Sequence, residues 1–145
     1  MGFYDRIRHR SATSLAEQPA TGSIDDLDGR GYCVLLTYKR SGEPVPTPVW
    51  FGVADGKVYT RTEADSWKVK RIRRNGRVRV APSTMRGRPL GPPFDGVARV
   101  LEAPEFERAE RAVASNYGLD RRLYMRFLGE APEDVTYIEV EPSRD

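Results

Sequence analysis

Short runs of strand-forming residues, separated by turn signals, constrain the fold of this chain more than any other feature. Residues 32–38 (YCVLLTY) suit a buried strand and are too few to favour a helix. A turn at 39–42 leads to a second run, residues 44–53 (PVPTPVWFGV), and Asp55-Gly56 is a hairpin signal before a third run at 57–62. Because proline cannot donate a hydrogen bond to a strand ladder, the three prolines place part of the second run at a sheet edge or a bulge.

Three later runs extend the pattern. Residues 77–81 (RVRVA) alternate strictly, which predicts Val78 and Val80 inward and the arginines outward. Residues 94–101 and 135–140 give a fifth and a sixth strand, and the apolar spacing predicts helices over 105–117 and 119–128. This order predicts a mainly β fold, β with a few helices: a barrel of about six mostly antiparallel strands with the helices outside.

Length and composition fit one ordinary globular domain. Residues 1–22 lack sustained periodicity and are expected to form a mobile N-terminal arm, with residues 23–145 as a single domain that starts with a short helix capped by Ser23. We expect a soluble, cytoplasmic protein, because no apolar run approaches the ~18 residues of a membrane span and no signal sequence is evident. The single cysteine, Cys33, fits a reducing compartment and is expected to be a small core hydrophobe.

Residues 59–76 (YTRTEADSWKVKRIRRNG) read as a strand that runs into a short basic helix. Asp65 or Ser66 is the expected N-cap, and Asn75-Gly76 is the expected stop. The free N–H groups and the dipole at such a helix start favour a phosphate or carboxylate, and Lys68 could add a full charge. The alternative is a solvated basic face whose apolar side chains, Trp67, Val69 and Ile72, touch the core.

Charge is distributed unevenly along the chain. The net charge is only +3, yet residues 57–88 hold eleven basic and two acidic side chains. Such a segment indicates an anionic partner, either a phosphate-bearing cofactor or a nucleic acid.

Several kinds of catalytic site are not supported by the sequence. His9 and Cys33 are the only histidine and cysteine, too few for the usual zinc sites or for a Ser-His-Asp or Cys-His system. Neither a GxGxxG nor a Walker A pattern occurs. A chain rich in cations and poor in acid–base groups suits a protein whose cofactor does the chemistry.

The ordered combination of TPVWF, the Asp-Gly hairpin, RTEADSWKVKRIRRN and VRVAPST resembles the split β-barrel flavin-binding family typified by pyridoxamine 5′-phosphate oxidase. It is most similar to the branch of oxidoreductases that depend on coenzyme F-420, a deazaflavin. The resemblance covers residues 32–101, with residues 135–142 as the expected last strand. It implies an FMN-binding split barrel and a homodimer with the cofactor in a cleft between two subunits.

The resemblance also assigns cofactor-binding roles to seven residues. It implies that the backbone near Trp50 lines the ring, that the end of the third strand approaches the ribityl chain, and that Ser66 and Lys68 bind the phosphate. Trp67 stands where flavin mononucleotide (FMN) oxidases of the family often have a third basic residue, which favours F-420. The full set is Pro48, Val49, Trp50, Arg61, Thr62, Ser66 and Lys68. Arg86 and Arg88 could meet the acidic tail of the coenzyme or form a solvated loop.

The implied activity is hydride transfer between reduced F-420 and a small unsaturated or carbonyl-bearing organic substrate, without a catalytic side chain or a metal. Two alternatives share the fold: an FMN-dependent oxidase or reductase, and a non-catalytic F-420 carrier. Nucleic-acid binding is a distant alternative, because the aromatics are not interleaved with the basic residues as a stacking platform requires.

Overall fold

The computed structural model describes residues 14–116 and 134–143, and within them one antiparallel sheet dominates. Its seven strands have the order β2-β1-β5-β6-β7-β4-β3. The strands are β1 (Tyr32–Tyr38), β2 (Pro44–Val49), β3 (Gly52–Ala54), β4 (Lys57–Glu63), β5 (Arg77–Ser83), β6 (Phe94–Val100) and β7 (Val135–Pro142). The helical elements are η2 (Ile24–Leu27), α2 (Trp67–Arg74), η3 (Ala103–Glu105) and α3 (Phe106–Ser115).

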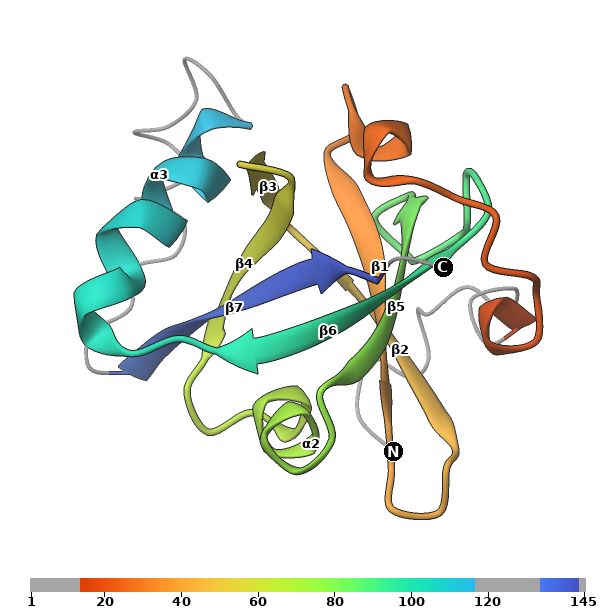
Figure 1. Cartoon of the computed structure of the whole chain (residues 1–145), viewed down its shortest axis with the longest axis horizontal. Helices are drawn as coiled ribbons and strands as arrows, with labels where there is room; N and C mark the ends of the chain where they lie inside the picture. The colour runs from red at the N-terminus through yellow and green to blue at the C-terminus, as the bar shows by residue number, and fades with distance from the viewer. Residues whose placement is uncertain (1–13, 117–133, 144–145) are drawn as a thin grey trace.

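The two edge strands, β2 and β3, are consecutive in the chain, and this curls the sheet into a half-open barrel (Figure 1). β2 pairs with β1, whereas β3 pairs with β4 at the opposite edge. The predicted second strand, residues 44–53, is therefore broken at Trp50 and Phe51, which is why seven strands occur where about six were expected. The carbonyls at the break accept side-chain hydrogen bonds, from Thr60 Oγ1 to Trp50 at 2.6 Å and from Asn116 Nδ2 to Phe51 at 3.0 Å.

The three prolines of β2 lie at an edge, as expected. Pro44, Pro46 and Pro48 pair with alternate residues of β1. Because proline has no N–H, the ladder hydrogen bonds to β1 must come from the residues between them, such as Val45 and Thr47. The backbone nitrogens of the three prolines therefore face away from β1.

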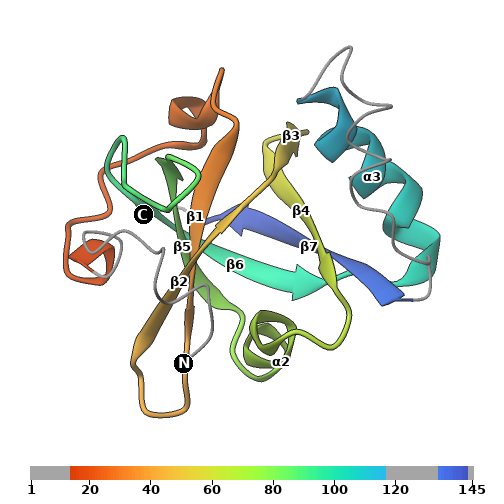
Figure 2. The ribbon, with the colours of Figure 1, turned by 180° about the vertical axis from the view of Figure 1, so that it is seen from behind.

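Apolar packing divides the molecule into an interior and a covered outer face. The barrel interior holds Val58, Val78 and Ile138, and the buried residues Val69 and Ile72 of α2 close it. Figures 1 and 2 show α2 at one end of the barrel, between β1 and the end of β4, and α3 at its side.

α3 covers the outer face of β3, β4 and β7. Its Ala112 and Val113 pack against Tyr59 and Tyr137. A Cβ on Gly52 would lie 1.8 Å from the Ala112 carbonyl oxygen, so this approach of helix to strand requires glycine. α3 ends near where the predicted helix over 105–117 does, with Asn116 as C-cap, and the predicted helix over 119–128 lies outside the described residues.

Residues 14–22 of the predicted arm contact the barrel. Leu15 is fully buried with Val34, Leu36 and Ala81. Arg79 Nη1 donates hydrogen bonds to the carbonyls of Leu15 and Gln18. The short helix after Ser23 is η2, whose capping box is complete. In the described part of the chain, no helix is long and apolar enough to cross a membrane.

Candidate functional site

The start of α2 is built around Ser66, which is the N-cap of the two candidates considered. Its Oγ accepts a hydrogen bond from the Val69 N–H at 3.4 Å, and its carbonyl accepts one from Lys70 N at 3.2 Å. The described residues provide no partner for the N–H groups of Trp67 and Lys68, the first two of the helix. Unpaired N–H groups at a helix start, with the positive end of the dipole, favour an anion.

α2 ends at Arg74 with Asn75 as its C-cap, at the predicted stop. Asn75 is extended rather than left-handed, with φ −146°. Gly76 is required because a Cβ there would lie 2.7 Å from the carbonyl oxygen of Ala98. The stop is therefore fixed by a close approach to β6.

A line of polar contacts joins the β2–β3 break to the start of α2. Thr60 and Thr62 are buried on the same face of β4. Thr60 Oγ1 donates to the Trp50 carbonyl at 2.6 Å, and Thr62 Oγ1 lies 3.4 Å from Ser66 Oγ. The structure thus brings three predicted site residues, Trp50, Thr62 and Ser66, to one side of β4.

Lys68 lies in the first turn of α2 and is partly buried. Burial lowers the pKa of its ammonium group, while the charge of Glu63 acts in the opposite direction. The described residues provide no ion-pair partner within 4.0 Å. A partly desolvated cation without a close ion-pair partner, beside helix N–H groups that no described residue binds, fits the phosphate of a cofactor.

Arg61 lies on the opposite face of β4 from Thr62. It pairs with Tyr137 across β4 and β7, on the side that α3 covers. Its Nε is buried without a hydrogen-bond partner, and so is Oε1 of Glu110. The other carboxylate oxygen of Glu110 accepts a hydrogen bond from the Tyr137 hydroxyl. Burial, and then this hydrogen bond, raise the pKa of Tyr137. Within one chain, therefore, Arg61 is not grouped with Thr62 and Ser66.

The remaining predicted residues, Pro48 and Val49, are buried at the end of β2. Val49 is part of the barrel interior, while the side chain of Trp50 packs toward the α3 cluster, with its ring 6.4 Å from that of Tyr32. In Figure 2, β2 and β4 diverge from β3 toward α2. The predicted ring-lining segment thus lies at the end of β2, and the predicted phosphate-binding residues lie at the start of α2, beyond the end of β4.

Four basic residues of α2 and β5 contact other parts of the chain. Arg71 Nε donates to Thr37 Oγ1 at 2.7 Å, and Arg74 Nη2 donates to the Tyr38 carbonyl at 2.7 Å. The Arg77 guanidinium lies 5.2 Å from the centroid of the Tyr38 ring, and Arg79 forms an ion pair with Asp95 at 2.8 Å. Arg74 and Arg77 are exposed, as a solvated basic face predicts, and each also contacts Tyr38 of β1. This also leaves fewer cations for a nucleic acid.

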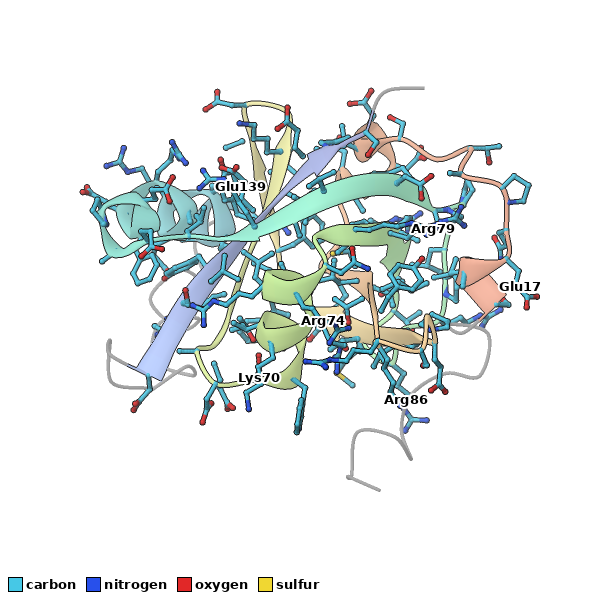
Figure 3. All side chains as sticks on the ribbon, turned by 60° about the horizontal axis from the view of Figure 1, so that its bottom comes forward. Glu17, Lys70, Arg74, Arg79, Arg86 and Glu139 are labelled. Carbon is cyan, nitrogen blue, oxygen red and sulfur yellow. The ribbon has the colours of Figure 1, made fainter. Side chains whose placement is uncertain are left out.

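The surface cations include Lys70 and Arg86, which point away from the sheet in Figure 3. Arg86 and Arg88 belong to the loop after β5, which folds back through the Ser83–Pro89 bridge. Their loop begins at the far end of β5 from α2, a separation of about 20 Å for a seven-residue strand. Within one chain they are therefore remote from Ser66 and Lys68.

Sequence reasoning missed a buried ionic network around Glu139. Its carboxylate accepts hydrogen bonds from the Tyr59 hydroxyl at 2.8 Å, Arg99 Nε at 3.0 Å and Arg108 Nη2 at 3.2 Å (Figure 3). Burial alone would raise the pKa of Glu139, but the hydrogen bonds from Tyr59 and Arg99, together with the charges of Arg99 and Lys57, hold the pKa below its ordinary value. Strand alternation places Tyr137 and Glu139 on one face, yet nothing local shows that α3 covers that face.

Cys33 is buried in the barrel interior, as predicted, and this burial raises the pKa of its thiol. Among the described residues, no group of three or more His, Cys, Asp or Glu side chains could hold a metal ion.

Known proteins resemble this chain in family and in fold. A family model described as pyridoxamine 5′-phosphate oxidase matches residues 24–144. A conserved hypothetical protein from Mycobacterium tuberculosis is 22% identical, with a TM-score of 0.62 over 83% of this chain and 78% of that one. A FAD-binding protein from Mesorhizobium loti is 16% identical, with a TM-score of 0.61 over 83% and 86%. An F420 reductase is also 16% identical, with a TM-score of 0.52 over 85% and 94%.

No curated protein matches the sequence significantly. At these identities the structural likeness shows the fold alone, and together with the curled antiparallel sheet it confirms the predicted split barrel.

Proposed function

Since this chain belongs to the pyridoxamine 5′-phosphate oxidase family, we propose that it is an oxidoreductase with a flavin-type cofactor, and that this cofactor is coenzyme F-420. The observation that carries the proposal is the start of α2. There, Lys68 is partly buried and has no ion-pair partner within 4.0 Å among the described residues, and it lies beside Ser66 and two backbone N–H groups for which those residues provide no partner. The fold neighbours that are a FAD-binding protein and an F420 reductase support a cofactor of this class.

The chain's own residues would bind and orient the cofactor. Ser66, Lys68 and the N–H groups of the first turn would hold its phosphate, and the backbone from Pro48 to Trp50 would line its ring. When bound, a reduced deazaflavin supplies a hydride to an unsaturated or carbonyl-bearing organic substrate. The buried apolar segments around Val49 would exclude water from the ring, so the protein contributes chiefly through positioning.

A homodimer with the cofactor between two subunits is part of the proposal. The resemblance supports it, and so does the position of Arg61, Arg86 and Arg88, which one chain does not bring to the phosphate site. Size-exclusion chromatography with light scattering should give twice the mass of the 145-residue chain. A monomer at micromolar concentration would contradict the shared cleft.

Titration of the protein with F-420 and with FMN, followed by cofactor fluorescence, tests the function. We expect tighter binding of F-420, and Lys68→Ala should weaken it by about 1.5–3 kcal/mol, the usual contribution of a hydrogen bond to a charged group. Lys39→Ala is the matched control, because Lys39 lies in the β1–β2 hairpin and pairs only with Glu43 among the described residues.

Three results would contradict parts of the proposal. Unchanged affinity in Lys68→Ala would remove Lys68 from the site, and tighter binding of FMN would assign the chain to the flavin alternative. Binding of neither cofactor would contradict the function as a whole. Turnover of quinones, enones or other unsaturated acceptors with reduced F-420 separates an enzyme from a carrier.

A further inference from the structure

Two buried polar atoms on the side of the sheet that α3 covers lack a hydrogen-bond partner, and they are of opposite kind. Nε of Arg61 carries a proton that it can donate, whereas Oε1 of the Glu110 carboxylate accepts. Among the described residues, these are the only buried side-chain nitrogen or oxygen atoms without a partner. Because such atoms are costly and rare in native folds, a donor and an acceptor left over in the same region require an explanation.

Tyr137 brings the two atoms into one cluster. It lies directly opposite Arg61 in the pairing of β4 with β7, so the two side chains leave the same face of the sheet. The Tyr137 hydroxyl donates a hydrogen bond to the other oxygen of Glu110, which belongs to α3 on that face (Figure 1). Burial raises the pKa of Tyr137, and the positive charge of Arg61 acts in the opposite direction, as a guanidinium close to the hydroxyl does. Arg61 and Glu110 are therefore both neighbours of the Tyr137 side chain.

The adjacent polar group on this face shows what a complete set of contacts is. There the sheet supplies the carboxylate, Glu139, and α3 supplies the guanidinium, Arg108, and the two bind directly at 3.2 Å. The Tyr59 hydroxyl is the third member of that group. In the second group the order is reversed, because the sheet supplies Arg61 and α3 supplies Glu110, yet these two form no ion pair within 4.0 Å. The contact that the first group makes directly is missing in the second.

The charges and hydrogen-bonding capacity of the second group define what can complete it. Arg61 would repel a cation and Glu110 would repel an anion, so the bound molecule must be neutral. It must accept a hydrogen bond from Arg61 and donate one to Glu110. It must also be small, because both atoms are buried and the Phe106 ring packs on that of Tyr137, with 5.1 Å between the centroids. Water is the smallest molecule that meets these conditions, and buried waters typically make about three hydrogen bonds.

We propose that a buried water molecule binds between Arg61 Nε and Glu110 Oε1, and that this water ties α3 to β4. The Tyr137 hydroxyl already ties Glu110 to β7, so with the water one carboxylate of α3 holds both strands. The water site is independent of the proposed cofactor. It gives Nε of Arg61 a role within one chain, separate from the cofactor contact that the family resemblance implies for this residue.

NMR of the arginine Nε–H groups, in the full-length protein labelled with nitrogen-15, tests the water site. The Arg61 Hε proton should show a nuclear Overhauser cross-peak to water with the sign of a long-lived bound molecule, and it should exchange slowly with the solvent. Arg79 is the internal control, because its Nε donates to the Asp95 carboxylate at 2.8 Å, so its Hε should show no such cross-peak. Arg61→Lys keeps the charge but removes the Nε–H group, and it assigns the signal by its loss.

Two variants of α3 test the acceptor. Glu110→Ala should abolish the long-lived cross-peak of Arg61, whereas Glu107→Ala should leave it unchanged, because Glu107 is exposed and pairs with Arg111. A cross-peak that persists in Glu110→Ala would show that the water does not need this carboxylate and would overturn the proposal. Exchange of the Arg61 Hε as fast as that of Arg73, which is exposed on α2, would overturn it as well.

A high-resolution crystal structure of the unaltered protein gives a second measurement that needs no variant to fold. Ordered water within about 3.2 Å of both Arg61 Nε and Glu110 Oε1 is the expected result. A direct ion pair between the two side chains, or a protein group bound to either atom in place of water, would overturn the water bridge. None of these results depends on whether F-420 or FMN binds, so the proposed function is tested separately.

Discussion

Replacing Glu139 with alanine tests how strongly one buried carboxylate holds α3 against the sheet. Glu139 is 3% exposed and the Tyr59 hydroxyl that binds it belongs to a residue 2% exposed. Leaving that hydroxyl without its acceptor costs about 1–3 kcal/mol. The Arg99 and Arg108 side chains are each 51% exposed and keep Glu105 as a partner, so their lost contacts add only about 1 kcal/mol together. We expect the free energy of unfolding to fall by roughly 2–4 kcal/mol.

Urea unfolding at a fixed protein concentration, followed by circular dichroism, measures this loss. Tyr59→Phe alone should cost about 1 kcal/mol, and in the Glu139→Ala background it should be neutral or stabilising, because the orphaned hydroxyl is gone. The two changes must therefore be strongly non-additive. Additive effects, or a loss below about 1 kcal/mol for Glu139→Ala, would refute the reasoning that the buried hydrogen bond carries the energy.

The same carboxylate predicts a pH dependence. The pKa of Glu139 is lower in the folded chain than its ordinary value of 4.5, so the unfolded chain binds the proton more readily. Its stabilising contribution is therefore complete above about pH 4.5 and is lost as the pH falls through the folded-state pKa. The stability difference between the unaltered protein and Glu139→Ala should shrink in acid. A constant difference down to about pH 3, well below the ordinary pKa of a glutamate side chain, would contradict this.

Three further predictions concern α2 and α3. Lys68→Met should raise the free energy of unfolding of the cofactor-free protein by about 1 kcal/mol, because a desolvated charge is removed, while F-420 titration shows weaker binding. Ser66→Ala should cost about 0.5–1 kcal/mol in urea unfolding, at the low end for an N-cap because the hydrogen bond is 3.4 Å long. Gly52→Ala should cost about 3 kcal/mol or more by the same measurement, because its Cβ would lie 1.8 Å from the backbone oxygen of Ala112. Gly31→Ala is the control: its Cβ would have no atom within 4 Å, so stability should change by less than about 0.5 kcal/mol. A small effect at Gly52, or a loss of stability in Lys68→Met, would contradict these readings of the packing.

Local sequence signals predicted most of the elements but not the chain's path at the β2–β3 break. β1, β4, β5 and β6 and the position of α2 follow from short strand runs, the Asp-Gly hairpin and the Ser66 cap. The break at Trp50 arises because the chain leaves β1 and joins β4, which depends on a sheet edge that only the assembled barrel provides. The same limit explains Arg74 and Arg77, whose partner Tyr38 is more than thirty residues away in the sequence.

For the candidate site, the sequence by itself determined the helix start with Ser66 and Lys68, because a helix cap depends only on a few adjacent residues. Only the tertiary structure decided which groups join it. Strand pairing placed Arg61 beside Tyr137 and separated it from Thr62, and packing buried Glu139 under α3 while leaving Trp67 open. Burial and charge pairing depend on contacts between distant segments, so the sequence did not show that Arg71 and Arg74 bind β1, or that Trp67, which was expected to touch the core, is exposed.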